Sequence, residues 1–219
     1  MGTMVAMVEG KSIIMLIIFD LDGVLVESKD MHYQTLNHAL EQVHKDYVID
    51  YVDHIENYDG LPTKRKLELL TANKGLPTKF YNQIQQEKQR LTIVWLGKLQ
   101  PDQNLITVFR HFKNQNYKIA VASNSIRESV KTALLSLHLM EFIDYFVSNE
   151  DVHYPKPFPE MYWKCMTNLN SLPIDTIILE DSPIGREGAL ASGGHLLPID
   201  SPNDITIKLI QQLIDEIKL

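Results

Sequence analysis

Two acidic side chains, Asp20 and Asp22, stand two residues apart directly after an apolar run at 13–19. A run of this length predicts a buried strand, and ligands bind at the carboxyl ends of strands in an open α/β sheet. Extended backbone would place both carboxylates on one side, where like charges cost free energy unless they share a cation or proton. Carboxylate oxygens suit Mg²⁺, and Gly23 permits a sharp turn. The pair predicts a metal-binding strand tip; a turn with solvated acids is the alternative.

Further polar groups follow, or lie near, other predicted strand ends. Ser123 and Asn124 come directly after a second apolar run, and Glu180 and Asp181 come after a later one. Lys156 lies between two prolines, which present it on a stiff segment. Each group has an ordinary alternative: a turn or helix N-cap for the short polar residues, and a solvated surface for the lysine. Together they predict acids, a hydroxyl and a lysine on one edge of one sheet.

The elements that must position these groups alternate along the chain. Strand-length apolar runs are separated by helical patterns, and continuous apolar runs suit strands that are covered on both faces. The alternation predicts an α/β fold with a doubly wound parallel sheet. The five runs lie at 13–19, 117–122, 143–147, 176–179 and 195–199.

The segment 25–97 interrupts this alternation. It has no clear strand run and carries several helical patterns. The sequence Gly-Leu-Pro-Thr occurs at 60–63 and again at 75–78, and both copies are typical of helix starts. The segment therefore predicts an α-helical insert after the first strand. The expected division is a core domain of residues 11–24 and 98–219, a helical domain of residues 25–97 and an N-terminal extension of residues 1–10.

Composition narrows the class of protein. The 219 residues include 44% hydrophobic residues and carry a formal net charge of −7, which argues against a nucleic-acid partner. One cysteine, Cys165, cannot form an internal disulfide, which suits a reducing compartment. No apolar run approaches the roughly 18 residues of a membrane helix. We expect a soluble cytoplasmic protein with no membrane partner, and a monomer is favoured although the oligomeric state is open.

Four motifs in order resemble those of one enzyme family. The sequences FDLDGVL, VASNS, KPFPEMY and LEDSPIGREGALASGG begin at residues 19, 121, 156 and 179. With these motifs the chain resembles the haloacid dehalogenase superfamily of phosphohydrolases. It is most similar to the branch that contains β-phosphoglucomutase and small sugar-phosphate phosphatases. The resemblance runs from about residue 13 to about residue 199, and it implies a doubly wound, Rossmann-like core with an inserted helical cap.

The resemblance assigns the covalent chemistry to the first motif. Asp20 would attack phosphorus and become an aspartyl phosphate, and Asp22 would protonate the leaving oxygen and then activate water. A carboxylate nucleophile splits one hard displacement into two easier ones. For the first step Asp22 must be protonated, which requires a pKa well above the usual value of about 3.9.

The remaining motifs supply the groups that neutralise charge. Phosphoryl transfer needs charge neutralisation and positioning more than covalent chemistry. The resemblance implies Mg²⁺ as the cofactor and a small phosphorylated substrate as the partner. The implied Mg²⁺ ligands are Asp20, the main-chain carbonyl of Asp22 and Asp181, with Glu180 in or near the metal shell. The implied holders of the phosphoryl oxygens are Ser123, Asn124 and Lys156.

The helical segment departs from the family pattern at the residues that would contact the substrate. β-Phosphoglucomutase has an arginine that grips the second phosphate, and Thr63 stands in its place here. Lys64, Arg65 and Lys66 follow at once and could substitute, although a solvated basic helix face is the favoured interpretation. His32 falls where the mutase has a histidine; a substrate contact and a partly buried structural histidine are both open.

These observations predict a Mg²⁺-dependent phosphatase for a small phosphorylated metabolite, a sugar or polyol phosphate. The first alternative is a β-phosphoglucomutase-like phosphotransferase, which the missing arginine disfavours. The second is a non-catalytic binding protein on the same fold, against which the intact acids and lysine weigh. Dehalogenation is disfavoured because that chemistry needs neither Asp22 nor a metal.

Overall fold

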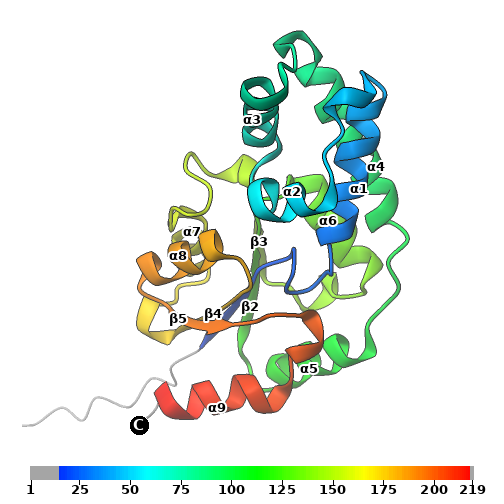
Figure 1. Ribbon diagram of the computed structural model, residues 1–219. Helices are drawn as coiled ribbons and strands as arrows, with labels where there is room; N and C mark the ends of the chain where they lie inside the picture. Colours follow the sequence, from blue (N-terminus) through cyan, green and yellow to red (C-terminus); the bar gives the residue numbers. More distant parts are fainter. Residues whose placement is uncertain (1–14, 218–219) are drawn as a thin grey trace, which may run out of the picture.

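The computed structural model describes residues 15–217, and Figure 1 shows a central sheet with a group of helices beyond one end of its strands. Positions 13 and 14 of the first predicted strand and the predicted extension 1–10 lie outside the described residues. The sheet has five parallel strands in the order β3-β2-β1-β4-β5. The strands are β1 (Leu16–Phe19), β2 (Lys118–Ala122), β3 (Tyr145–Val147), β4 (Thr176–Glu180) and β5 (His195–Pro198).

The central strand places the acidic motif at the point where the chain changes direction across the sheet. Leu16 pairs in register with Lys118 of β2 on one side and with Thr176 of β4 on the other. The crevice at such a switch point is where open α/β sheets bind ligands. The predicted doubly wound parallel sheet is confirmed, and Asp20 leaves β1 between the tips of its two neighbours.

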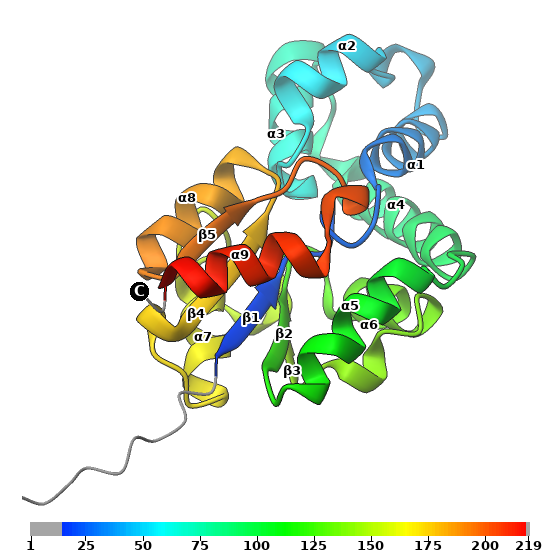
Figure 2. The same cartoon turned by 90° about the horizontal axis from the view of Figure 1, so that it is seen from below.

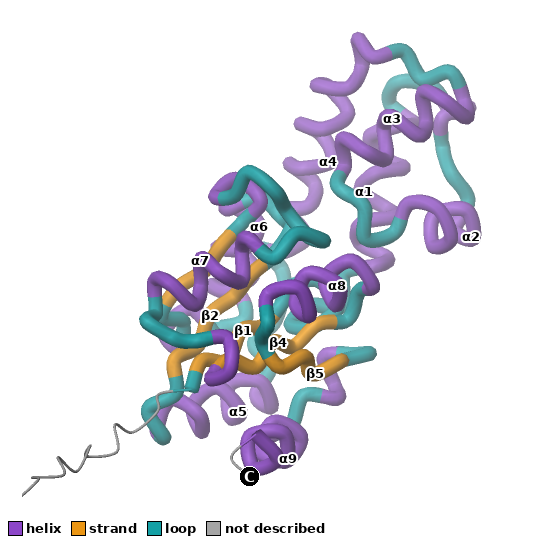
Figure 3. The backbone as a smooth tube through the Cα atoms, turned by 90° about the vertical axis from the view of Figure 1, so that its left-hand side faces the viewer, coloured by secondary structure: helices purple, strands orange, loops and turns teal. Residues whose placement is uncertain are grey.

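Alternating residues of β1 pack on opposite faces of the sheet. Ile17 and Phe19 belong to one buried core and Leu16 and Ile18 to the other, so the continuous apolar run serves two layers. Figures 2 and 3 show α5 and α9 on one face and α7 and α8 on the other. Core helices are α5 (Gln103–Asn114), α6 (Arg127–Ser136), α7 (Glu160–Asn168), α8 (Pro183–Ser192) and α9 (Ile207–Ile217).

The helices between β1 and β2 form a group of their own, here called the helical insert. They have a separate apolar core that includes Leu36, Leu40, Leu67 and Ile84. The insert therefore holds its shape by its own packing, and the predicted domain boundaries 25–97 stay a prediction. Its helices are α1 (Lys29–Glu41), α2 (Tyr51–Asp53), α3 (Thr63–Lys74) and α4 (Tyr81–Leu96).

Some elements differ in extent from the sequence prediction. The third strand begins two residues later than expected, at Tyr145, because Ile143 closes a 3₁₀ turn. The sequence also did not predict the π-helical turn η2 (His54–Tyr58) that continues α2. Within residues 15–217 no helix is long and apolar enough to cross a membrane. The 3₁₀ turns are η1 (Lys45–Tyr47), η3 (Thr78–Phe80), η4 (Met140–Phe142), η5 (Asn149–Asp151), η6 (Pro173–Asp175) and η7 (Pro202–Asp204).

Candidate active site

A cavity of about 410 Å³ lies between the strand tips and the helical insert. This volume is within the range of roughly 300–1,000 Å³ that is usual for small-molecule sites. Residues from both parts of the chain face the cavity, which brings together most of the residues singled out from the sequence. Those that line it are Asp20, Asp22, His32, Thr63, Lys64, Ser123, Asn124, Lys156 and Asp181.

A tight turn after β1 aims the first acidic pair. The Gly23 amide donates to the Val26 carbonyl at 2.7 Å, and the Leu25 amide donates to the Leu21 carbonyl at 2.9 Å. Gly23 has φ +86°, and a Cβ there would stand 2.0 Å from the Asp181 carboxylate. Glycine is therefore required twice, for the left-handed backbone and for the close approach of Asp181.

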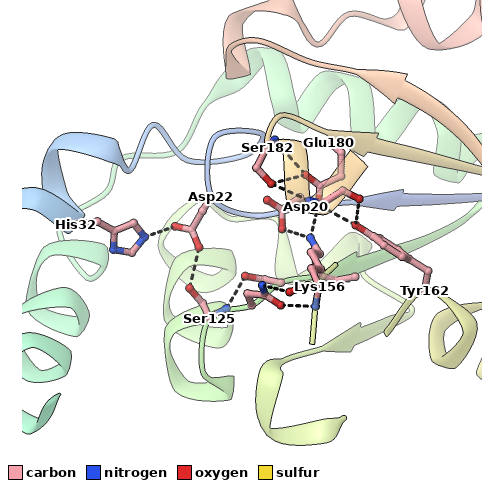
Figure 4. Close-up of polar contacts among 12 residues, drawn as sticks. Asp20, Asp22, His32, Ser125, Lys156, Tyr162, Glu180 and Ser182 are labelled. Atoms are coloured by element: carbon pink, nitrogen blue, oxygen red, sulfur yellow. Dashed lines mark hydrogen bonds and ion pairs between the residues drawn. The ribbon is translucent and has the colours of Figure 1, made fainter. Parts of the chain in front are cut away.

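Lys156 is the buried cation of the site (Figure 4). Its Nζ donates to Asp20 Oδ1 at 2.6 Å, to the Ala122 carbonyl at 2.8 Å, and to Glu180 Oε1. The lysine is 5% exposed and Glu180 is fully buried. Burial alone would lower the pKa of the lysine, but the two carboxylates hold that pKa well above its usual range. The neighbouring carboxylates therefore favour the charged form of the ammonium beside Asp20.

Glu180 lies behind the lysine and not at the cavity surface. Besides Lys156, its Oε1 accepts a hydrogen bond from the Tyr162 hydroxyl at 2.8 Å. Its Oε2 accepts from the Ser182 hydroxyl at 3.3 Å. A Cβ on Gly185 would stand 2.1 Å from the Glu180 carboxylate, so α8 passes close over this acid only because residue 185 is glycine. Glu180 thus orients Lys156.

Three carboxylates converge on a possible metal position. Oxygen atoms of Asp20, Glu180 and Asp181 lie within 4.8 Å of one another. Asp181 Oδ1 is buried and has no hydrogen-bond partner among residues 15–217. Burial, with Glu180 second, raises the pKa of Asp181 to about 6. An orphaned buried oxygen in an all-oxygen cluster fits a hard divalent cation such as Mg²⁺, which would supply the missing partner.

Two neighbours, His32 and Ser125, hold the Asp22 carboxylate (Figure 4). Its Oδ2 accepts from the Ser125 hydroxyl at 2.7 Å, and its Oδ1 lies 3.0 Å from His32 Nε2. Lys88 Nζ lies 3.2 Å from His32 Nδ1. With Lys88 donating to Nδ1, the imidazole proton is on Nε2 and is donated to Asp22. This chain of contacts joins α4 and α1 of the insert to the strand tip.

The neighbours of Asp22 act on its pKa in opposite directions. Burial raises it, but His32, Ser125 and Ser28 together lower it below the usual range. Every neighbour that touches the carboxylate is a hydrogen-bond donor, so the raised pKa that the first step requires must come from the substrate. The hydrogen-bond donors around Asp22 favour its ionised form, which is the form required of a base.

Asn124 of the VASNS motif binds the backbone of the segment that carries Lys156. The Asn124 side chain accepts from the Lys156 amide at 3.0 Å and donates to the Lys156 carbonyl at 3.3 Å. Its amide group is therefore committed to holding the lysine, which leaves the main chain for any ligand contact. Ser123 is 1% exposed, and its hydroxyl oxygen accepts from the Ser125 amide at 3.0 Å.

The basic run of α3 divides between solvent and cavity. Lys64 is exposed at the rim of the cavity, and Arg65 is exposed and paired with Glu68 at 3.0 Å. Lys66 is only 6% exposed and lines the cavity. The interpretation as a solvated basic face therefore holds for Arg65 and is wrong for Lys66. Thr63 lines the cavity at the first position of the helix.

Helix α4 contributes a polar stripe to the same cavity. Its lining residues Gln85, Lys88, Gln89 and Thr92 recur at the spacing of one helix face. The side-chain amides of Gln85 and Gln89 make no hydrogen bond to another residue in the part of the chain that the structure describes. Each amide therefore offers a free donor and a free acceptor to a ligand.

Sequence reasoning missed several contributors to the site. Ser125 and Tyr162 lie inside quoted motifs, so their position in VASNS and KPFPEMY was the available signal. Lys88 had no signal, because a lysine in a helix pattern is ordinarily solvated. Only the packing of α4 against α1 brings its ammonium to His32.

The comparison with known proteins agrees with the resemblance inferred from the motifs. A family model described as haloacid dehalogenase-like hydrolase matches residues 17–197, well over half of the chain. The chain belongs to this family. As a haloacid dehalogenase-like hydrolase it is an enzyme, and its α/β fold with a parallel sheet is the one that the family resemblance predicted.

Curated relatives and solved structures are similar over most of the chain. The phosphorylated carbohydrates phosphatase of Thermotoga maritima is 27% identical over 180 residues, 81% of this chain and 81% of the relative. The β-phosphoglucomutase of Bacillus subtilis is 26% identical over 216 residues, 90% of this chain and 93% of the relative. The β-phosphoglucomutase structure from Clostridium difficile has a TM-score of 0.79 at 20% identity, covering 93% of this chain and 98% of that one. This structural likeness establishes the fold.

Proposed function

We propose that this enzyme is a Mg²⁺-dependent phosphatase that hydrolyses a small phosphorylated sugar or polyol through an aspartyl phosphate on Asp20. The observation that supports it most is the contact of the buried, charged Lys156 with Asp20 at the floor of the cavity. A fixed cation beside a carboxylate nucleophile offsets the repulsion between that carboxylate and an anionic phosphate.

In the first step a carboxylate oxygen of Asp20 attacks phosphorus, and the bond between phosphorus and the ester oxygen breaks. Lys156 and donors at the strand tip hold the phosphoryl oxygens, with Ser123 contributing its hydroxyl and Asn124 its main chain. Asp22 gives a proton to the leaving oxygen, which departs as an alcohol. A bound phosphate next to Asp22 raises the pKa of Asp22, which opposes the effect of His32 and Ser125.

In the second step water attacks the same phosphorus atom, and the bond to Asp20 breaks. Asp22, now ionised, takes a proton from the water and is protonated for the next turnover. The hydrogen bonds from His32 and Ser125 favour this ionised form. They keep the base ready once the leaving alcohol has gone.

The residues that would hold Mg²⁺ are Asp20, Asp181 and the main-chain carbonyl of Asp22, with Glu180 behind them. When bound, the ion would neutralise charge on the transferring phosphoryl oxygens. Support comes from the orphaned oxygen of Asp181 and from Gly23, which leaves room for that carboxylate.

The helical insert would act as a cap that selects the substrate and excludes water. The free amides of Gln85 and Gln89 are suited to sugar or polyol hydroxyls, and the names of the Thermotoga and Bacillus relatives agree with a phosphorylated carbohydrate. The second candidate is phosphotransfer between positions of one sugar, which the Bacillus relative supports by its name.

Phosphate release from a panel of phosphorylated sugars, polyols, nucleotides and glycolate, with Mg²⁺ and with EDTA, tests the function. Metal-dependent release from a narrow group of sugars or polyols is expected. No release from any compound, together with retained Mg²⁺ binding, would indicate a non-catalytic binding protein. Conversion of β-glucose 1-phosphate to the 6-phosphate, only with added 1,6-bisphosphate and without net release, would indicate the phosphotransferase.

A further inference from the structure

All the hydrogen-bond donors of the Lys156 ammonium are used within the protein. An ammonium carries three N–H groups, and Nζ donates to Asp20 Oδ1, to the Ala122 carbonyl and to Glu180 Oε1. A phosphoryl oxygen that binds Lys156 must therefore replace one of these three acceptors. Of the three residues, only Asp20 lines the cavity, whereas Ala122 and Glu180 are fully buried. The bond to Asp20 is thus the one that an entering anion can exchange.

Tyr162 of α7 holds one of the two acceptors that must stay. Its hydroxyl donates at 2.8 Å to Glu180 Oε1, the same oxygen that accepts from Lys156. A tyrosine hydroxyl keeps its proton at neutral pH, so this donor is always present. Asp20 Oδ1, by contrast, accepts only from Lys156 among residues 15–217. Two donors therefore hold the Glu180 oxygen, and one donor holds the Asp20 oxygen.

The ring of Tyr162 also faces the ammonium. Lys156 Nζ lies 5.3 Å from the ring centroid, and a cation within about 6 Å of an aromatic face is attracted to it. The ring is fully buried, and Gly188 of α8 leaves room for it, since a Cβ there would stand 3.2 Å from Tyr162 Cε2. Tyr162 therefore contacts the lysine through its ring and an acceptor of the lysine through its hydroxyl.

Building on the phosphatase function proposed above, we propose that Tyr162 is a positioning residue that keeps Lys156 on Glu180 while the ammonium exchanges Asp20 for the phosphoryl group. In the empty site the ion pair covers Asp20 Oδ1. When the anion enters, Lys156 moves one donor from Asp20 to a phosphoryl oxygen, which leaves Oδ1 free to attack phosphorus. Tyr162 does not line the cavity, so it acts on the reaction only through Lys156 and Glu180.

Variants of Tyr162 are expected to lower kcat more than they change KM. Lys156 contributes most where charge develops in the transition state, so a misplaced ammonium affects kcat first. Tyr162→Phe keeps the ring and removes the hydroxyl, and kcat should fall about tenfold while KM stays within about threefold of the wild type. Tyr162→Leu also removes the cation–π contact and should lower kcat by about a further tenfold.

A control on the same strand as Glu180 separates positioning from loss of stability. Thr176→Val removes a buried hydroxyl that donates to the Leu172 carbonyl at 2.8 Å, at the other end of β4. It also costs one buried hydrogen bond, but it should leave kcat unchanged. Wild-type kcat in Tyr162→Phe, or an equal loss of kcat in Thr176→Val, would overturn the inference.

Vanadate binding separates the positioning role from the phosphatase function. Orthovanadate resembles the phosphoryl group in its transition state, and calorimetric titration with Mg²⁺ measures its affinity without turnover. Tyr162→Phe should bind vanadate about tenfold more weakly than the wild type, and Thr176→Val should bind it equally well. That loss of affinity, with no phosphate release by the wild type, would refute the phosphatase and keep the positioning role. Phosphate release by the wild type, with unchanged vanadate affinity in Tyr162→Phe, would do the reverse.

Discussion

Replacing Lys66 with methionine is expected to make the ligand-free protein more stable. Burial, followed by the charge of Lys88, lowers the pKa of the ammonium from 10.5 to about 8. Each pKa unit corresponds to about 1.4 kcal/mol, so the buried charge costs about 3 kcal/mol of folding free energy. Methionine keeps the apolar stem of the side chain and removes the charge. The substitution should therefore raise the free energy of unfolding by up to about 3 kcal/mol near pH 7.

The pH dependence has a defined sign. Between pH 8 and 10.5 the unfolded chain keeps the lysine proton while the folded protein releases it. The unfolded state then binds more protons, so the stability of the wild type rises with pH across this window. Below it both states are charged and the full cost of burial remains. The stability difference between Lys66→Met and the wild type should therefore shrink as the pH is raised through the window.

Urea denaturation followed by circular dichroism, near pH 7 and near pH 10, measures this difference. Arg65→Met is the matched control, because Arg65 is exposed on the same helix and its pairing with Glu68 is a surface ion pair. It should change stability by less than about 1 kcal/mol at either pH. A Lys66→Met protein that is less stable than the wild type near pH 7, or a difference that does not change with pH, would refute the reasoning.

Three other substitutions test the packing around Lys156 and around the Cys165 thiol. Gly185→Ala places a Cβ where the Glu180 carboxylate lies, so Glu180 must move away from Lys156, and kcat should fall by about a hundredfold in steady-state assays; wild-type kcat would show that this contact is dispensable. Tyr162→Phe removes the donor to Glu180 Oε1 and should lower the free energy of unfolding by about 1–2 kcal/mol in urea, whereas an unchanged midpoint would contradict the hydrogen bond. Burial raises the pKa of Cys165 to about 12, so a thiol reagent should not label the native protein and Cys165→Ala should keep full activity; rapid labelling would place the thiol outside the core.

The layers of the fold were predictable because each rests on a local pattern. Continuous apolar runs such as Ile17 to Phe19 are what a strand buried on both faces requires, and their order with helical patterns predicts the parallel sheet. The π-helical turn at His54 was not predictable, since it depends on how the insert packs and has no periodic pattern of its own. Strand ends were uncertain for the same reason, as Ile143 shows.

Site residues that lie in recognisable motifs could be predicted from the sequence. Properties that depend on how side chains are oriented in the packed structure could not. Asp20 and Lys156 were found from motifs, whereas the ionised form of Asp22 depends on donors from two separate segments, the start of α1 and the turn after β2. Lys66 shares a helix face with the buried Leu70, so its burial had a signal in the spacing of four residues. That the buried lysine faces a cavity and Lys88, and not an acid, required the packed structure.

Trapping the covalent intermediate tests the central claim most directly. Rapid acid quench of the enzyme during turnover of its best substrate with Mg²⁺, followed by peptide mass spectrometry, should find one phosphoryl group on the peptide that contains Asp20. Asp22→Asn should accumulate this species, because its hydrolysis needs the base, and Asp20→Asn should show neither the species nor phosphate release. Phosphate release that persists in Asp20→Asn, or a phosphoryl group on another residue, would contradict the account.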